Sequence, residues 1–350
     1  MLHRLSNVAT ATGAAIGSSV LLTGADAQPA RARNRKTRHD FLNCVAIMQK
    51  RRIGSLDVSV VGIGCNNFGR RLDENATAKV VRAALDEGIN FFDTADTYGS
   101  TKSEEFLGRA LGKQRKDVRI ATKFGMAIDD EHKGAKPEYV KQAAEDSLRR
   151  LGTDYIDLYQ LHKPDDSVPI ADTLGALDDL VKSGKVREIG CSNFDADQLH
   201  EADASAKPGA ARFVSVQNEY SLFHREPENA VLRECAGLGM SFLPFFPLAN
   251  GLLTGKYRKG QAPPAGARIT SGWHGELLTD ENLDMVEKLI AFAESHGHTL
   301  LELAFSWLLE RPMVSSVIAG ATSPEQVHAN ANAAGWDLTE TELVELSRIV

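Results

Sequence analysis

From about residue 50 onward the chain alternates two patterns of hydrophobic and polar positions. Short runs rich in β-branched and aromatic residues are typical of buried strands, and between them apolar residues recur at helical spacing. The pattern predicts strands at 58–64, 89–93, 118–123, 155–162, 186–192, 213–218, 240–246 and 315–320. It predicts helices between them, among them 76–88, 103–112, 138–152, 170–184 and 228–239.

Local signals agree with these helix boundaries. Glycines stand where helices should end, at Gly88, Gly112, Gly152, Gly184 and Gly239. The segment 323–326, SPEQ, places a capping residue before a proline at the first helical position, and 339–342, TETE, forms another capping box. Eight strand–helix alternations without a break in composition predict a single (β/α)8 TIM barrel over residues 48–350.

An open doubly wound sheet is the alternative architecture, and it would require a glycine-rich phosphate loop after the first strand. Gly62 and Gly64 begin such a pattern, but Asn67 occupies the third glycine position. The segment 251–256, GLLTGK, is one residue short of a P-loop, and Tyr257 stands where Ser or Thr would hold magnesium. Both nucleotide motifs are incomplete, which favours the barrel.

Composition narrows the functional classes. Hydrophobic residues make up 43% of the chain and charged residues 25%, values ordinary for a soluble globular protein. A formal net charge of −7 argues against a nucleic-acid partner, which would need a basic face. The histidines form no H-E-x-x-H or comparable cluster, so we expect no metal. The four cysteines form no C-x-x-C pair, and we interpret them as free thiols in a reducing, cytoplasmic compartment.

Residues 1–47 differ from the rest. They carry six basic and two acidic residues, a net charge of +4, which leaves −11 for the remainder. An A-x-A triplet before Gln28 weakly resembles a signal-peptide cleavage site, but the apolar part is broken by Thr, Ser and Gly and is too short to span a membrane. We interpret this segment as a disordered tail or an extension upstream of Met48, with export through a cleaved segment as the alternative.

Polar residues recur at the expected carboxyl ends of the strands, where barrel enzymes carry their chemistry. These residues are Asp93, Tyr98, Lys123, His162, Ser192, Asn193, Gln217 and Asn218. A buried lysine kept charged by an aspartate lowers the pKa of a neighbouring tyrosine, which can then act as a general acid. We therefore expect Asp93, Lys123, Tyr98 and His162 to form one site, and we assign Asp96 to the turn between them.

Several long segments resemble the aldo-keto reductase family over essentially residues 49–350. The segment 91–111, FFDTADTYGSTKSEEFLGRAL, resembles the signature around that family's catalytic Asp and Tyr. Its lysine and histidine strands are similar to ATKFG (121–125) and DYIDLYQLHKPD (154–165). The segments VREIGCSNF, VSVQNEYSL, PLANGLLTGKY and VIAGATSPEQV resemble its cofactor-binding segments.

The resemblance implies a TIM barrel that reduces an aldehyde or ketone with NADPH, NADH being the alternative cofactor. Tyr98 would donate the proton, Lys123 paired to Asp93 would lower its pKa, and His162 would orient the carbonyl. The residues implied to hold the cofactor are Ser192, Asn193, Gln217, Phe245, Phe246, Pro247, Leu248, Asn250, Gly320, Thr322, Gln326 and Asn330.

The sequence departs from the family pattern at two parts of this cofactor site. Phe245 replaces a tyrosine that stacks on the nicotinamide, and Phe246 replaces a serine near the pyrophosphate. Gly320, Thr322 and Gln326 stand where Lys or Arg often binds the 2′-phosphate, which leaves His328 as the one partly basic candidate.

Two other functions share this fold. The alternatives to a reductase are a nucleotide-sensing regulatory subunit and a lyase that uses Lys123 as a Schiff-base nucleophile. We expect residues 66–68, 124–136 and 251–279, with Trp273, to line the pocket of a small carbonyl substrate. The sequence indicates no particular substrate and no oligomeric state.

Overall fold

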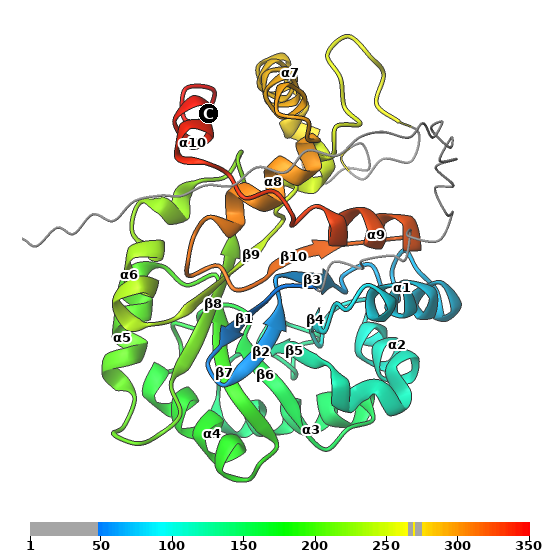
Figure 1. Ribbon diagram of the computed structural model, residues 1–350. Helices are drawn as coiled ribbons and strands as arrows, with labels where there is room; N and C mark the ends of the chain where they lie inside the picture. Colours follow the sequence, from blue (N-terminus) through cyan, green and yellow to red (C-terminus); the bar gives the residue numbers. More distant parts are fainter. Residues whose placement is uncertain (1–47, 265–268, 270–274) are drawn as a thin grey trace, which may run out of the picture. The chain divides into compact units, whose positions relative to one another are not determined.

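The structure is a computed structural model that describes residues 48–264, 269 and 275–350, so the segment 1–47 and Trp273 lie outside the described residues. Eight parallel strands form its centre, in the order β10-β3-β4-β5-β6-β7-β8-β9 (Figure 1). They are β3 (Val61–Gly64), β4 (Phe91–Asp93), β5 (Arg119–Phe124), β6 (Ile156–Leu161), β7 (Val186–Ser192), β8 (Phe213–Glu219), β9 (Ser241–Phe245) and β10 (Val317–Gly320).

The two edges of this sheet meet. Phe242 of β9 forms a parallel bridge with Val314, just before β10. Its amide donates to the Met313 carbonyl at 2.7 Å, and the Ser315 amide donates to its carbonyl at 3.3 Å. The sheet is therefore a nearly closed barrel, which confirms the TIM-barrel prediction and excludes the open doubly wound sheet.

Each barrel strand leads into a helix that packs on the outside of the barrel. In chain order these helices are α1 (Glu74–Asp86), α2 (Lys102–Leu111), α3 (Pro137–Leu151), α4 (Ile170–Lys182), α5 (Ala196–Ser205), α6 (Val231–Leu238), α8 (Leu300–Leu309) and α9 (Pro324–Asn332). The predicted caps of the last helices are confirmed, because the side chains of Ser323 and Thr339 accept from the amides three residues on. Among the described residues, no helix combines the length and apolarity needed to cross a membrane.

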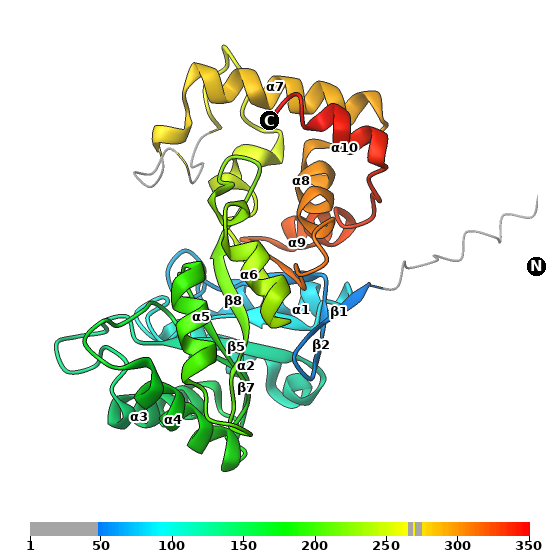
Figure 2. The ribbon, with the colours of Figure 1, turned by 90° about the vertical axis from the view of Figure 1, so that its left-hand side faces the viewer.

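Two further helices, α7 (Asp280–Ser295) and α10 (Glu340–Leu346), lie outside this repeat and next to each other (Figures 1 and 2). The His298 ring stacks on Trp336 with ring centroids 4.1 Å apart. His296, which caps α7, faces Glu345 of α10 at 3.8 Å. These contacts fix the carboxyl-terminal helix on the body.

The interior of the barrel holds an apolar layer beneath a polar one. Phe91, Ala121, Leu158, Leu243 and Ile318 form the apolar layer, one from each of five strands. Because side chains alternate between the two faces of a strand, the next inward position lies two residues further on. That position is Asp93 on β4, Lys123 on β5 and Gln160 on β6. The strand period thus brings the polar residues to one end of the barrel.

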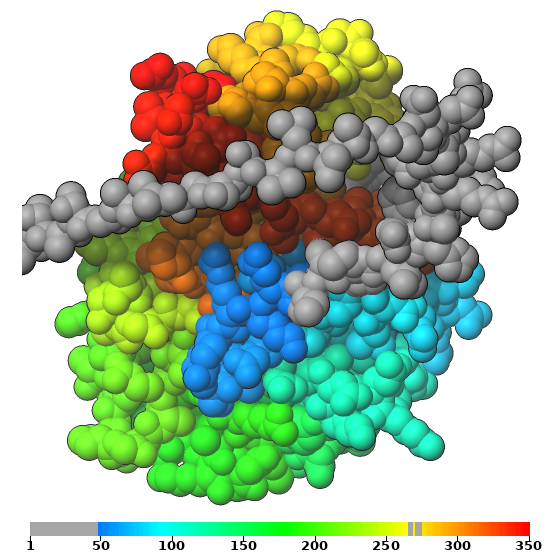
Figure 3. Space-filling view, viewed as in Figure 1, coloured from blue at the N-terminus to red at the C-terminus, as the bar shows by residue number. Residues whose placement is uncertain are grey.

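A hairpin closes the opposite end. β1 (Lys50–Ile53) pairs antiparallel with β2 (Leu56–Ser59), and Ile53, Leu56 and Val58 pack against the apolar layer. Figure 3 shows this hairpin at the centre of the visible face. The predicted single strand 58–64 was therefore wrong. The chain changes sheets at Val60, whose amide donates to Gln49 of the hairpin segment and whose carbonyl accepts from Val317 of the barrel.

Arg51 attaches the hairpin to the outer layer. Its guanidinium donates to the carbonyls of Leu309 (2.7 Å), Arg311 (3.2 Å) and Val314 (2.7 Å), at and beyond the end of α8. Hydrogen bonds from charged groups are worth more than neutral ones, and the bond to Leu309 satisfies one of the carbonyls at the end of α8.

We predict that Arg51→Ala lowers the free energy of unfolding by roughly 2–3 kcal/mol. Arg52→Ala is the matched control, because the neighbouring Arg52 is exposed. Denaturant unfolding of both variants measures the difference. Equal losses in the two variants would show that the carbonyl contacts contribute little.

Candidate active site

The centre of the candidate site is an ion pair inside the barrel. The Lys123 ammonium lies 2.7 Å from Oδ2 of Asp93 and donates to the Thr94 carbonyl at 2.9 Å. The lysine is fully buried and Asp93 is 3% exposed. A buried lysine of this kind needs a charged partner, and neighbouring strands β4 and β5 supply both members.

Two glutamines occupy the other oxygen of Asp93. Nε2 of Gln217 donates to Oδ1 at 2.8 Å, and Nε2 of Gln160 donates to the same oxygen at 3.3 Å. Sequence reasoning predicted Gln217 and missed Gln160. The signal was present, because Leu158, Gln160 and His162 share one face of β6 at period two.

Tyr98 reaches this ion pair from the loop after β4. Its hydroxyl lies 3.5 Å from Nζ of Lys123, and the ammonium is 5.0 Å from the centre of the ring. The ring of His162 meets the Tyr98 ring edge-on at 5.8 Å between centroids. The structure therefore brings the four predicted residues, Asp93, Tyr98, Lys123 and His162, together at the carboxyl ends of the strands.

The environment sets the charges of these groups. Burial by itself lowers the pKa of Lys123, but the charges of Asp93 and Tyr98 outweigh it and raise the pKa, so the lysine stays charged. Burial raises the pKa of Tyr98, and Lys123 only partly opposes that rise. The expectation of a lowered tyrosine pKa was therefore wrong for the net shift, although the lysine acts in the expected direction. The phenol remains protonated at neutral pH.

His162 is a neutral imidazole near pH 7. Burial, followed by the charges of Lys123 and Lys163, lowers its pKa to about 3. His162 is 7% exposed, and its Nδ1 has no partner within the described part of the chain. A neutral ring in this place can donate a hydrogen bond to a carbonyl oxygen without adding a second cation beside Lys123.

Polar side chains at the carboxyl ends of β7 and β8 lie beside the ion pair. Ser192 donates to the Gln217 carbonyl at 2.7 Å, and Asn193 donates to the His162 carbonyl at 2.9 Å. Asn193 has φ of 61°, a left-handed conformation that is uncommon outside glycine. These contacts hold three of the predicted cofactor residues, Ser192, Asn193 and Gln217, next to His162.

The loop after β9 is strained. Phe246, Ala249 and Asn250 all have left-handed backbones, with φ of 50°, 44° and 55°. The Asn250 side chain is buried, and neither its oxygen nor its nitrogen finds a partner among the described residues. Strain and unpaired polar atoms in one loop are typical of a binding segment. The predicted residues Phe245, Phe246, Pro247, Leu248 and Asn250 all lie in or beside it.

The remaining predicted cofactor residues gather at the end of β10 and the start of α9. The Thr322 amide donates to Oε1 of Gln326 at 2.8 Å, and Asn330 is buried. Gly320 ends β10 and lies against Asn67, since an added Cβ would meet Nδ2 of that residue at 3.3 Å. His328 is engaged with Glu87 at 2.5 Å.

One residue predicted to line the substrate pocket is buried instead. Phe68 is fully buried in the hydrophobic core, so it does not present its ring to a pocket. Lys256, for which the sequence suggested no individual role, lies beside the strained loop, and burial and Arg71 lower its pKa. A desolvated ammonium next to a loop with unpaired polar atoms is a further candidate for contact with an anionic group.

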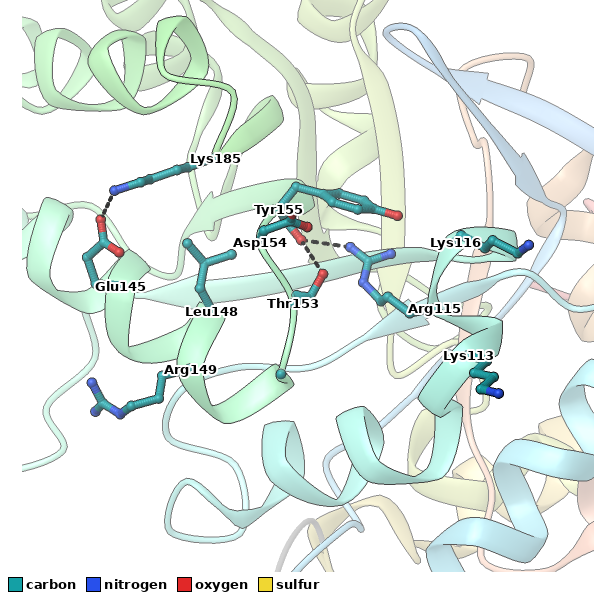
Figure 4. Close-up of a pocket in the computed structure, with 11 residues that line it drawn as sticks. Lys113, Arg115, Lys116, Glu145, Leu148, Arg149, Thr153, Asp154, Tyr155 and Lys185 are labelled. Carbon is teal, nitrogen blue, oxygen red and sulfur yellow. Dashed lines mark hydrogen bonds and ion pairs between the residues drawn. The ribbon is translucent and has the colours of Figure 1, made fainter.

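A surface hollow of about 780 Å³ lies elsewhere, among residues that precede β5, β6 and β7 (Figure 4). It is therefore at the amino-terminal end of the barrel, opposite Asp93 and Lys123. Lys185 is paired there with Glu145, and Arg115 donates to the Tyr155 carbonyl at 2.9 Å. We assign this hollow no part in the candidate site. Across the described ranges, no group of three or more His, Cys, Asp or Glu side chains is placed to hold a metal ion.

Comparison with known proteins identifies the relatives of this chain. The model of the aldo/keto reductase family matches residues 60–350. A probable aldo-keto reductase 1 from Glycine max is 34% identical over 303 residues, which cover 84% of this chain and 86% of the relative. A probable voltage-gated potassium channel subunit beta from Arabidopsis thaliana is 34% identical over 299 residues, covering 82% and 91%.

A solved structure is similar as well. The glycerol dehydrogenase AKR11B4 from Gluconobacter oxydans superposes with a TM-score of 0.75 at 30% sequence identity. The match covers 86% of this chain and 94% of that one.

The neutral state of His162 predicts a stability that depends on pH. Its pKa in the folded protein is lowered from 6.5 to about 3, so the folded state binds fewer protons than the unfolded state between these values. The contribution of neutral His162 to the free energy of unfolding is present above pH 6.5 and is lost as the pH falls towards about 3. Between pH 7 and pH 5 the free energy of unfolding of the unchanged protein should therefore fall by roughly 2 kcal/mol more than that of His162→Gln.

Denaturant unfolding at pH 5 and pH 7 checks this expectation. His200→Gln is the control, because His200 is an exposed histidine on α5. If His162→Gln loses as much stability between pH 7 and pH 5 as the unchanged protein, the imidazole is not buried in its neutral form.

Proposed function

The chain belongs to the aldo/keto reductase family of oxidoreductases, and we propose that it reduces an aldehyde or ketone to the alcohol with NADPH. The observation that carries this proposal is the contact of the Tyr98 hydroxyl with an ammonium that Asp93 holds buried and charged. A proton donor beside a fixed positive charge, at the end of a barrel where chemistry is carried, is suited to carbonyl reduction.

The residues present fit a dinucleotide cofactor. Donors and acceptors from Ser192, Asn193 and Gln217 lie beside the proton donor, where they suit a nicotinamide carboxamide. The strained loop with the unpaired Asn250, and Lys256 beside it, suit the pyrophosphate. Asn330 and the start of α9 suit the adenosine end.

The amide of Gln217 has a defined orientation in this scheme. Because its Nε2 donates to Asp93, its oxygen remains as an acceptor for the carboxamide. When bound, the reduced nicotinamide supplies a hydride to the carbonyl carbon. Gln217 then links the nicotinamide end of the site to the carboxylate that holds Lys123.

The chain's own residues handle the proton. His162, as a neutral donor, orients the carbonyl oxygen towards Tyr98. The Tyr98 hydroxyl transfers its proton to this oxygen as the carbon is reduced, which leaves a phenolate. The Lys123 ammonium, 3.5 Å away, stabilises that phenolate, and Asp93 keeps the lysine in place.

Of the two alternatives, the Schiff-base lyase receives less support from the site. A nucleophilic lysine needs a lowered pKa, whereas Asp93 and Tyr98 raise the pKa of Lys123. A nucleotide-sensing regulatory role has one observation in its favour, the similarity to a probable potassium channel subunit beta. Steady-state turnover of a generic aldehyde separates that role from the enzyme.

The proposed partner is a small carbonyl compound. A cytoplasmic location remains part of the proposal, and Cys65, Cys191 and Cys235, which are free and buried, are compatible with it.

Tyr98→Phe tests the proton donor. The ring is kept and the acidic proton is removed, so cofactor affinity should survive while kcat falls by at least ~10²-fold, the lower end of general acid catalysis. Lys123→Met should cause a comparable loss of kcat, because the ammonium would no longer stabilise the phenolate of Tyr98. Asp93→Asn should cause a smaller loss of kcat. The measurements are kcat for one good aldehyde and NADPH affinity by fluorescence. Retention by Tyr98→Phe of more than about a tenth of kcat would identify another group as the donor.

Gln326→Arg tests the 2′-phosphate end. No Lys or Arg stands at Gly320, Thr322 or Gln326, so the unchanged chain should favour NADPH only modestly. A guanidinium at position 326 should tighten NADPH roughly tenfold and leave NADH nearly unchanged, because it pairs with phosphate in a bidentate manner. Ala329→Arg, a turn further along α9, is the matched control. Equal tightening of both cofactors would place position 326 away from the 2′ group.

A further inference from the structure

A buried polar cluster lies directly behind the wall of the candidate site. It consists of Asp96, Glu104, Tyr139, Arg150 and Tyr159. In the register of β5 and β6, Lys123 lies beside Gln160 and Thr122 lies beside Tyr159. Because alternate residues face opposite sides of a strand, the first pair faces the barrel interior and the second faces helices α2 and α3. The cluster is thus separated from Lys123 by one layer of backbone.

Asp96 is the unusual member of this cluster. It is fully buried, and neither of its carboxyl oxygens makes a well-formed hydrogen bond to any described residue. The hydroxyls of Tyr139 and Tyr159, which lie within its electrostatic range, are also buried without partners. Native proteins rarely leave several polar atoms unpaired in one place, so this arrangement requires a reason.

The cluster contains two buried carboxyl groups and one guanidinium. Arg150 pairs with Glu104 at 2.6 Å, and Thr122 donates to the other oxygen of Glu104 at 2.5 Å. Glu104 is therefore satisfied, while Asp96 is left beside a second negative charge. Burial and Glu104 raise the pKa of Asp96 to about 7, and Arg150, the Thr97 amide and Lys123 only partly offset this.

The backbone of Asp96 joins this cluster to the reacting groups. Its amide donates to the carbonyl of Lys123 at 3.1 Å. Two residues further on, the Tyr98 amide donates to the Ala95 carbonyl at 3.2 Å, which closes a tight turn around Asp96. Asp96 and Tyr98 therefore belong to one turn, and that turn is bonded to the backbone of Lys123.

We propose that Asp96 is a positioning residue for Tyr98, whose protonated carboxyl group holds the turn in place and whose ionisation loosens it and slows reduction. The proposal rests on the proposed role of Tyr98. A protonated carboxyl group is uncharged beside Glu104, whereas the ionised group repels that carboxylate in a region of low dielectric. The charged groups that face Asp96 are Glu104 on α2, Arg150 on α3 and Lys123 on β5.

A first experiment measures the carboxyl group without reference to activity. Asp96→Asn mimics the protonated acid, and its stability is compared with that of the unchanged protein from pH 4 to pH 8. In the folded state Asp96 retains its proton from 3.8 to about 7, where the unfolded state has lost it. The contribution of this proton to the free energy of unfolding is therefore fully present below pH 3.8. It decreases as the pH rises and has been lost above about 7.

The melting temperature of the unchanged protein should accordingly decline relative to Asp96→Asn across this window. Asp117→Asn is the matched control, because it makes the same change at an exposed position just before β5. A constant difference between the unchanged protein and Asp96→Asn from pH 4 to pH 8 would overturn the proposal, whatever the function of the chain.

A second experiment measures kcat for one aldehyde against pH in the same proteins. At pH 6 the unchanged protein and Asp96→Asn should be nearly equal. At pH 8.5 Asp96→Asn should be faster by about fivefold to about a hundredfold, since misplacing a catalytic group by about an ångström costs up to ~10²-fold. Parallel profiles would refute the positioning role even if the stability result is as expected.

The two failures are distinguishable. If Tyr98→Phe remains active, the proposed role of Tyr98 as proton donor fails, and the stability measurement on Asp96 still stands. If Tyr98→Phe is inactive but Asp96→Asn has the same pH profile as the unchanged protein, only the positioning role fails.

Discussion

The ion pair of Asp93 and Lys123 is the constraint on which the rest of the site depends. An ammonium without a partner inside a barrel would lose its proton or disrupt the fold, because moving a charge out of water is costly. Asp93 keeps the lysine charged, and Gln160 and Gln217 satisfy the second oxygen of that carboxylate. The result is a positive charge fixed in place before any substrate arrives, beside the hydroxyl of Tyr98.

The barrel determines where this pair can lie. Side chains that alternate along each strand fill the lower interior with an apolar layer, which the β1–β2 hairpin closes with Ile53, Leu56 and Val58. The next inward layer is polar and opens towards the carboxyl ends of the strands. All six non-glycine residues with left-handed backbones in the described segments lie in loops at that end, after β4, β7 and β9. Rigid strands thus carry the charged groups, and strained loops surround them.

The buried polar cluster behind β5 and β6 places further charged groups on the other side of the barrel wall from Lys123. Glu104 and Arg150 form a satisfied pair, while Asp96 has a carboxyl group whose charge depends on pH near neutrality. Its backbone contacts the Lys123 strand on one side and leads into Tyr98 on the other. The same short segment, 93–98, therefore contains a fixed charge, the proposed pH-sensitive group and the proposed proton donor, two of them facing into the barrel and one facing out.

The sequence by itself determined the eight strands, most helix ends and the residues at the strand ends, because these depend on local periodicity, caps and the order of strands in a closed sheet. It did not separate 58–64 into a hairpin strand and a barrel strand, since the two share one apolar run and differ only in their partners, Gln49 and Val317. It missed Gln160, and it assigned Asp96 to a turn without its buried environment. Tertiary structure decided those points, together with the upward shift of the Tyr98 pKa. Burial and charge at each of these residues come from segments distant in the chain, and no local pattern records them.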